Sequence, residues 1–311
     1  MKKIISLKFR ILLLFVAAIT VLNIQIFYGQ QEHPARVGQP SAEKNLYVYF
    51  LDVGQGDSAF IRTPNGKNIL IDAGQCAIVN VDEFDAGKEI VIPFLIKKNI
   101  TKIDYVVASH AHADHLGGLL SVMKKFPVGV VYDSGFSYSS PIYENFLQII
   151  KLKKISYNLV GKGDVLNWDP DLTVKVLSPR KNNLFEDPNN NSIVLKITYK
   201  NVSFLFTGDA EALAEDEIVG NYKKSELSSV ILKVPHHGSK TSSTEYFLDA
   251  VNPEVAVISC GRYNRFRHPH PDTVRRFDDF NIELHRTDKE GTIFVSTDGE
   301  TYTIKSLGFK K

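Results

Sequence analysis

Four side chains able to bind a metal ion fall within six residues of this sequence: His110, His112, Asp114 and His115. Imidazole and carboxylate groups are the usual ligands of zinc, manganese and iron. His110 and His112 alternate and can point to one side of a loop, while Asp114 and His115 face another side. Three of the chain's nine histidines lie in this stretch, which argues against chance histidines in a polar loop. The spacing therefore predicts a loop that supplies ligands to two ions.

The flanking segments indicate how this loop is positioned. Residues 105–109 form an apolar run typical of a buried strand, and residues 116–125 have the pattern of a helix. The ligands then lie in a turn at the C-terminal end of a strand, where α/β sheets place their chemistry. The glycines of residues 52–58 predict a tight turn close to the metals rather than a phosphate-binding loop.

Acids and histidines recur at strand ends elsewhere in the chain. Asp209 follows an apolar run and precedes a helical pattern. It can be a simple helix N-cap, but beside a metal cluster a carboxylate that bridges two ions is the better interpretation. Asp72 ends a strand in the same way, and we expect it to orient ligands from behind. Of the adjacent His236 and His237 we favour His237 as a metal ligand, and expect His236 to bind substrate or donate a proton.

The first ion lacks a third imidazole, because no histidine lies between His115 and His236. Its remaining ligands must then be oxygens. The candidates are Asp209, water, Asn190, Asn191 and Asp133. An oxygen-rich site accepts manganese or magnesium more readily than a three-histidine site does. We expect two divalent ions, Zn²⁺ or Mn²⁺.

A basic loop follows the strand predicted at residues 255–259. It contains Arg262, Arg265, Arg267, Arg275 and Arg276, with Asn264 and His268 between them. Guanidinium groups suit phosphate oxygens, so a loop overhanging the metals gives a positive wall. For Arg275 and Arg276 a solvated helix start is an equal alternative. The residues expected to bind substrate are Asn191, Ser239, Arg262, Asn264 and Arg267, and those expected to act in catalysis are Asp114, Asp209, His236 and His268.

The chain of 311 residues divides into three parts. Residues 1–30 have a basic start and an apolar stretch, which predict a signal peptide or an N-terminal membrane anchor, with a buried helix as the alternative. Residues 31–45 read as a polar tether, and residues 46–311 as one hydrolase domain. The positive start places the bulk outside the cytoplasm, secreted or anchored. Cys76 and Cys260 are two free thiols by default, with a disulfide left open.

Strand and helix patterns alternate from residue 46 onward. The order of strand, acid, helix, strand and histidine occurs twice, once around Asp72 and His110 and once around Asp209 and His236. Two such halves facing each other give an α/β sandwich of two mixed sheets with helices outside. The predicted strands are residues 47–52, 58–62, 68–72, 105–109, 129–132, 172–177, 192–199, 202–207, 230–235, 255–259 and 292–296, and the predicted helices are residues 90–98, 116–125, 142–152, 212–220, 244–251 and 271–280.

The metal motif, with Gly117 and Gly118 after it, resembles the signature of the metallo-β-lactamase-fold hydrolases. More narrowly, the chain resembles the extracytoplasmic hydrolase domain of the ComEC competence proteins. The matching stretches are residues 52–58, 70–74, 109–118, 190–195, 206–209, 232–239 and 259–269. The resemblance implies an αββα sandwich (the metallo-β-lactamase fold) with a two-metal edge site. By its pattern His110 and His112 bind the first ion; Asp114, His115 and the His236–His237 pair bind the second; Asp209 bridges.

The resemblance also implies a nuclease or phosphodiesterase, with DNA as one candidate substrate. Only the hydrolase part carries over, because this chain has one candidate membrane segment and not a polytopic channel. The membrane is then a partner only through an uncleaved N-terminal segment, and no protein partner is implied. A phosphocholine ester is the main alternative, for which Tyr138, Tyr143 and Tyr263 are candidate cage residues. A β-lactam or another carbonyl substrate, and an inactive binding module, are further alternatives.

Overall fold

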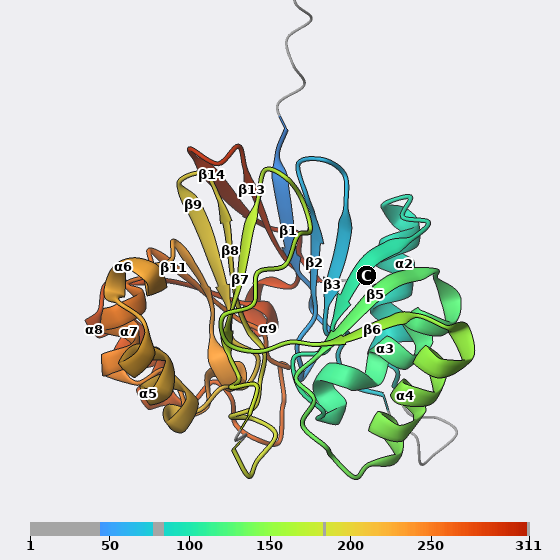
Figure 1. Cartoon of the computed structure of the whole chain (residues 1–311). Coiled ribbons are helices and arrows are strands. Elements are labelled where there is room, and N and C mark those ends of the chain that lie inside the picture. The colour runs from blue at the N-terminus through green and yellow to red at the C-terminus, as the bar shows by residue number, and fades with distance from the viewer. Residues whose placement is uncertain (1–43, 77–83, 183–184, 310–311) are drawn as a thin grey trace, which may run out of the picture. The chain divides into compact units, whose positions relative to one another are not determined.

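Two β-sheets pack face to face, with helices on their outer sides (Figure 1). The computed structural model describes residues 44–76, 84–182 and 185–309. The predicted leader and almost all of the predicted tether lie outside these residues. Within the described part, no helix is long and apolar enough to cross a membrane. The first strand begins at Leu46, where the sequence predicts that the domain begins.

The first sheet has eight strands and combines a meander with a parallel half. Strands β14, β13, β1, β2 and β3 pair antiparallel, and β3 to β6 pair parallel. In spatial order the strands are β14 (Tyr302–Ser306), β13 (Ile293–Thr297), β1 (Leu46–Phe50), β2 (Ala59–Arg62), β3 (Asn68–Ile71), β4 (Ile103–Val107), β5 (Val128–Asp133) and β6 (Ser156–Leu159).

The second sheet has six strands and the same mixed character. Strands β7, β8 and β9 pair antiparallel, and β9 to β12 pair parallel. In spatial order the strands are β12 (Glu283–Arg286), β11 (Val255–Ile258), β10 (Ile231–Lys233), β9 (Val202–Phe206), β8 (Val194–Tyr199) and β7 (Thr173–Ser178).

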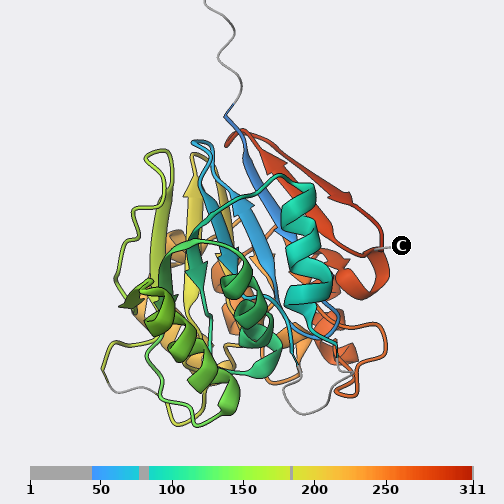
Figure 2. The same cartoon turned by 90° about the vertical axis from the view of Figure 1, so that its right-hand side faces the viewer.

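Helices cover the outer face of each sheet, as Figures 1 and 2 show. On the eight-stranded sheet they are η1 (Gly87–Val91), α2 (Ile92–Lys97), α3 (Ala113–Lys125) and α4 (Pro141–Lys153). On the six-stranded sheet they are α5 (Ala212–Asn221), α6 (Lys224–Leu227), α7 (Glu245–Val251) and α8 (Pro271–Asp279). Two further short segments are η2 (Pro235–Gly238) and α9 (Thr287–Glu290).

Three apolar cores hold these layers together. The central core lies between the sheets and includes Phe50, Trp168 and Phe204, and an outer core lies under the helices of each sheet. Central strands are buried on both faces, which explains why β11 is a continuous apolar run and β9 is apolar except for Ser203. Each fully buried Leu, Ile or Phe side chain stabilises the fold by about 1.5–3 kcal/mol.

The αββα sandwich expected from the sequence is confirmed. Each strand and helix predicted above has a counterpart, although the helix predicted at residues 90–98 begins earlier, in η1. Sequence patterns missed the edge strands β6 and β12 and the outer strand β14, whose residues are largely exposed or half-buried. Cys76 is half-buried and Cys260 buried, and both thiols are unpaired.

Candidate metal centre

The first ligand loop connects β4 to α3. His110 follows the strand, His112 is the residue before the helix, and Asp114 and His115 lie in its first turn. Helix α3 packs closely against the segment that follows β3, because a Cβ on Gly118 would lie 2.0 Å from the carbonyl oxygen of Ala73. The glycine thus allows α3 to approach closely enough to bring its first turn to the sheet edge.

The loop at residues 52–58 lies against the same turn. Gly56 has a φ of +133°, and a Cβ there would lie 2.1 Å from the carbonyl oxygen of Asp114. The amide of Asp57 donates to that oxygen at 3.1 Å. The prediction of a tight turn beside the ligands is therefore confirmed, and glycine is required for the close approach.

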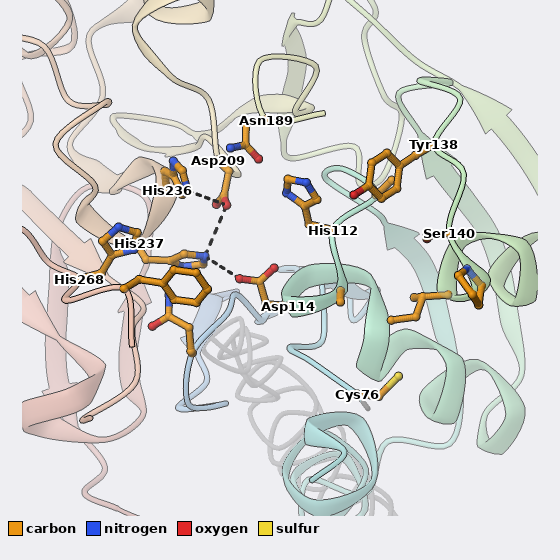
Figure 3. Close-up of a pocket in the computed structure, with 16 residues that line it drawn as sticks. Cys76, His112, Asp114, Tyr138, Ser140, Asn189, Asp209, His236, His237 and His268 are labelled. Atoms are coloured by element: carbon orange, nitrogen blue, oxygen red, sulfur yellow. Dashed lines mark ion pairs between the residues drawn. The ribbon is translucent and has the colours of Figure 1, made fainter. Parts of the chain in front are cut away.

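The Asp209 carboxylate lies between two groups of histidines. Figure 3 shows it with His112 on one side and His236 and His237 on the other. Its Oδ2 lies 3.8 Å from His110 Nε2 and 3.5 Å from His237 Nε2, and its Oδ1 lies 3.1 Å from His115 Nε2. Two sets of donor atoms, each within 4.8 Å of one another, result: His110, His112 and Asp209 in the first, and Asp57, His115, Asp209 and His237 in the second.

His115 is held from behind by Asp72. The carboxylate of Asp72 lies 2.9 Å from His115 Nδ1 and accepts hydrogen bonds from the amide and hydroxyl of Ser109. Asp72 has a positive φ of 55°, a conformation that aspartate tolerates better than most residues. The other ring nitrogen, Nε2, is thereby left to face Asp209. This contact is the kind by which a carboxylate orients a metal-binding imidazole.

The histidine pair occupies strained backbone, with φ of 48° at His236 and 53° at His237. The two side chains diverge. His237 is buried, and its Nε2 lies 3.4 Å from the carboxylate of Asp114. His236 is half-buried and its Nδ1 lies 3.0 Å from Glu211. His237 is therefore the member of the pair that lies in a donor set, and His236 faces the cavity.

Asp57 belongs to the second donor set, but neighbouring groups already hold its carboxylate. It approaches His237 on the Nδ1 side, at 3.1 Å, away from the Nε2 that faces Asp209. Its other oxygen lies 2.6 Å from the ammonium of Lys233. A carboxylate already paired with an ammonium is a poor cation ligand. We therefore expect Asp114, rather than Asp57, to bind the second ion.

The charges of the site fit a divalent metal. Burial lowers the pKa of His110 and His112, which keeps both imidazoles in the neutral form that binds metal. Burial also lowers the pKa of His115 and His237, but the carboxylates around each ring, with Asp209 contributing most, together outweigh it and raise both values well above the ordinary one. The buried carboxylates thus require positive charge beside them. Without a metal, protons on His115 and His237 supply that charge. A bound cation would displace these protons and supply the charge instead.

Two adjoining cavities open over the donor atoms. The first has a volume of about 570 Å³ and is lined by Asp114, Asp209, His236 and His268, among others (Figure 3). The second, of about 780 Å³, shares Gln55 and Asp114 with the first. The ligand Asp114 therefore lies at the boundary between them.

Two expected oxygen ligands and two expected substrate contacts are corrected by the structure. The Asn190 side chain accepts from the first amides of α5, so it caps that helix. The Asn191 side chain bonds to Phe185 and Asp187 and holds its loop. Ser239 bonds to Thr241 and Thr273 and lines neither cavity. These loops fold tightly, and their polar side chains form hydrogen bonds within the fold that the sequence pattern does not indicate.

A third oxygen ligand named from the sequence is also corrected. Asp133 accepts hydrogen bonds from the hydroxyls of Tyr143 and Tyr157. It lines neither cavity over the donor atoms. Asp133 is therefore a buried structural acid and not a metal ligand.

The basic loop divides into supporting and cavity-facing residues. Arg262 stacks on Phe309 and Arg276 bonds to the carbonyls of Ser242 and Ser243, so both support the surface. Arg267 lines neither cavity, contrary to expectation. Asn264, Arg265 and His268 do line a cavity, but the Asn264 side chain uses its hydrogen bonds on Gly261 and His268 and is not the free substrate contact expected from the sequence.

Sequence reasoning missed residues whose roles depend on packing. Lys233 and Glu211 are examples, since nothing in their local sequence indicates a partner at the site. Asn189 is a third: it lines the first cavity beside Asp209 (Figure 3), and its Oδ1 is buried without a hydrogen-bond partner among the described residues. Its position in the stretch Asn189-Asn190-Asn191 was the available signal, but the pattern cannot say which asparagine faces the metals.

Comparison with known proteins places the fold and the family. The model of the metallo-beta-lactamase superfamily matches residues 51–262. The ComE operon protein 3 of Bacillus subtilis is 35% identical over 79% of this chain and 32% of its own length. Competence protein ComA of Neisseria gonorrhoeae is 32% identical over 81% of this chain and 32% of its own length. This chain thus spans about a third of the curated relatives that it matches.

Solved structures agree on the fold. Igni18, a metallo hydrolase of Ignicoccus hospitalis, has a TM-score of 0.51 at 16% identity, with 80% of this chain and 98% of that chain covered. CmlA, a diiron beta-hydroxylase of Streptomyces venezuelae, has a TM-score of 0.50 at 13% identity, with 80% and 53% covered. Because the family model matches more than half of the chain, the chain belongs to the metallo-β-lactamase superfamily of metal-dependent hydrolases, and it is similar to the ComEC-family proteins.

Proposed function

We propose that this protein hydrolyses phosphodiester bonds, as a nuclease or phosphodiesterase with two divalent ions. The observation that carries the proposal is the place of Asp209, whose Oδ2 lies 3.8 Å from His110 Nε2 and whose Oδ1 lies 3.1 Å from His115 Nε2. A carboxylate so placed can bridge two cations. The first ion takes His110 and His112, and the second takes Asp114, His115 and His237.

Manganese is the preferred metal in this proposal. The first donor set has two imidazoles, and His236 lies on the other side of Asp209. Asn189, with its unpartnered amide oxygen, replaces Asn190 and Asn191 as the nearby oxygen donor. Oxygen-rich sites favour manganese over zinc.

The side chains divide the remaining work between them. Two bound divalent ions supply a water of lowered pKa and neutralise charge on a phosphate group. Asp114 and Asp209 orient that water. His236, held at Nδ1 by Glu211 and exposed to the cavity, is placed to give a proton to the leaving oxygen.

His268, which the sequence predicts to act in catalysis, does not suit the role of an acid. Burial lowers the pKa of His268 to about 4, helped by the neighbouring His237 and His236. The imidazole is therefore neutral at pH 7 and serves as a wall and hydrogen-bonding group.

The choice of a phosphodiester rests on charge and on the relatives. Arg265 lines the second cavity, and its guanidinium suits a phosphate oxygen. One relative, of Haemophilus influenzae, is named recombination protein 2, and that of Neisseria gonorrhoeae is named competence protein ComA. Recombination is a reaction of DNA, so DNA is the first candidate. The fold alone does not choose the reaction, since CmlA shares it and is a hydroxylase.

The three tyrosines named from the sequence as a phosphocholine cage do not converge. Tyr138 lines the first cavity and Tyr263 the second, while Tyr143 is buried against Asp133. The three rings do not surround one space. For its location we propose that residues 1–30 export the domain, leaving it secreted or anchored to the membrane.

An assay of the full chain with manganese, magnesium or zinc tests the proposal. The substrates are single-stranded DNA, duplex DNA, bis-p-nitrophenyl phosphate, a phosphocholine ester and nitrocefin. We expect cleavage of DNA and of the bis-ester, and loss of both in His112→Ala. Turnover of nitrocefin or of the phosphocholine ester alone would refute the proposal.

A further inference from the structure

The second cavity continues the first beyond the metal ligand Asp114. The two cavities share Gln55, Cys76, Ala113, Asp114 and Phe266. A substrate whose reacting phosphate lies at Asp209 therefore extends past Asp114 into a further space of about 780 Å³. That space is too large for a lone phosphate group and fits a nucleotide-sized unit.

Exposed aromatic rings gather at this second cavity. Tyr263 is 94% exposed, Phe266 51% and Phe84 41%, and all three line it. Such rings contribute little to folding, because folding stabilises by burying them. Within the described part of the chain, no ring or cation contact involves Tyr263. Its ring faces are therefore available to a ligand.

The loop that carries Tyr263 is fixed in place. The side chain of Asn264 donates to the carbonyls of Gly261 and His268 at 2.8 and 2.6 Å and accepts from the His268 amide at 2.9 Å. Phe266 stacks on His268, with ring centroids 5.8 Å apart, and the Arg265 guanidinium lies 4.9 Å from its ring. Tyr263 is thus presented from a braced loop, which lowers the entropic cost of binding a ligand.

The charge beside the ring selects the kind of ligand. Arg265 is exposed, lines the same cavity and offers guanidinium donors to a phosphate oxygen. An aromatic ring with an arginine next to it is the arrangement by which proteins hold an unpaired base and its phosphate. Bases in a duplex are stacked on one another and cannot stack on a side chain.

We propose that Tyr263 stacks on an unpaired nucleobase next to the scissile phosphate, with Arg265 on the neighbouring phosphate, so that the enzyme acts on single-stranded polynucleotide. This inference rests on the proposed phosphodiesterase function. It adds the form of the substrate and the residue that selects it.

The test measures Kd by fluorescence anisotropy for the full chain with manganese, using a labelled oligothymidylate with phosphorothioate linkages and the same strand with abasic sites. Tyr263→Ala is expected to weaken binding of the base-containing strand about tenfold and that of the abasic strand by less than about twofold. Tyr263→Phe, which keeps the ring, is expected to bind like the wild type. Tyr246→Ala is the matched control, since Tyr246 is 56% exposed on α7 and lines neither cavity.

Equal weakening for both strands, or no weakening, overturns the inference. So does tighter binding of the annealed duplex than of the single strand. Hydrolysis of bis-p-nitrophenyl phosphate by the wild type reports separately on the proposed function. Turnover of that ester without an effect of Tyr263→Ala on Kd refutes the stacking site alone, whereas no turnover of any phosphodiester refutes the function.

Discussion

The ammonium of Lys233 lies 2.6 Å from the carboxylate of Asp57, beneath His237, and the two side chains are only 5% and 7% exposed. Burial raises the pKa of Asp57, but Lys233 and His237 outweigh it and hold the value below its ordinary range. Asp57 therefore remains charged beside the metal centre, and the ammonium of Lys233 stabilises that charge. This buried pair links β10 to the loop before β2.

Removing one partner of this pair is expected to destabilise the fold strongly. Lys233→Met leaves the Asp57 carboxylate buried and unpaired, which costs about 3–5 kcal/mol. Urea unfolding of the metal-free protein measures the loss. The double variant Lys233→Met with Asp57→Asn removes both charges and should recover most of it. If the double variant is no more stable than Lys233→Met, the unpaired charge of Asp57 is not the cause of the lost stability.

Asp72→Asn is expected to weaken metal binding. The carboxylate fixes the ring of His115 through Nδ1, and losing such a partner typically costs about 10–100-fold in metal affinity. Asparagine tolerates the positive φ at this position, so the fold should remain. Calorimetric titration with Mn²⁺ measures the affinity.

Asp169→Asn is the control for that measurement. Asp169 is also buried and bonds to Thr63, Asn65 and Asp171, but it lines neither cavity. Its replacement should leave the affinity for Mn²⁺ as in the wild type. An equal loss in both variants would mean that Asp72 acts only on stability.

Asp209→Asn should cost more activity than stability. The amide can no longer bridge two cations, and we expect phosphodiester hydrolysis to fall about a thousandfold. The free energy of unfolding of the metal-free protein should change by less than about 2 kcal/mol, because His115 and His237 can release their protons once the charge is gone. Parallel losses of activity and stability would point to a purely structural acid.

The buried Glu215 makes stability depend on pH. Burial raises its pKa to about 7, although its carboxylate accepts from the amides of Ser243 and Thr244. A raised pKa means that the folded state binds the proton more tightly. Its contribution to stability is then fully present below about pH 4.5 and is lost as pH rises through about 7.

Glu215→Gln isolates this contribution. Between pH 4.5 and pH 7.5 the wild type should lose up to about 3 kcal/mol of unfolding free energy relative to the variant. Denaturant unfolding at several pH values measures it. A difference that does not change with pH would contradict the raised pKa.

The candidate ligands were predictable where their spacing is local. One short stretch contains His110, His112, Asp114 and His115. The other two, Asp209 and His237, follow strands in the second half of the chain, where the pattern of the first half recurs. The supporting residues were not predictable in this way. Lys233 lies in a three-residue strand where its neighbours are apolar, and only the packing of β10 against the loop before β2 brings its ammonium to Asp57.

Loop residues were the main source of error. Asn191 and Ser239 have the right chemistry for binding substrate, but their loops close on them and use their hydrogen bonds internally. Arg262 lies in the predicted basic loop, yet the surface offers it Phe309 and the carbonyl of Asp288 instead. The backbone conformation of a loop decides which of its side chains faces a cavity, and residue types alone do not predict that conformation.

The central claim is that Asp209 lies between two bound cations. Anomalous diffraction from crystals grown with Mn²⁺ tests it most directly. We predict two peaks about 3.5–4 Å apart, one beside His110 and His112 and one beside Asp114, His115 and His237, with Asp209 contacting both. A single peak, or a peak beside Asp57 with none at His110, would contradict the account.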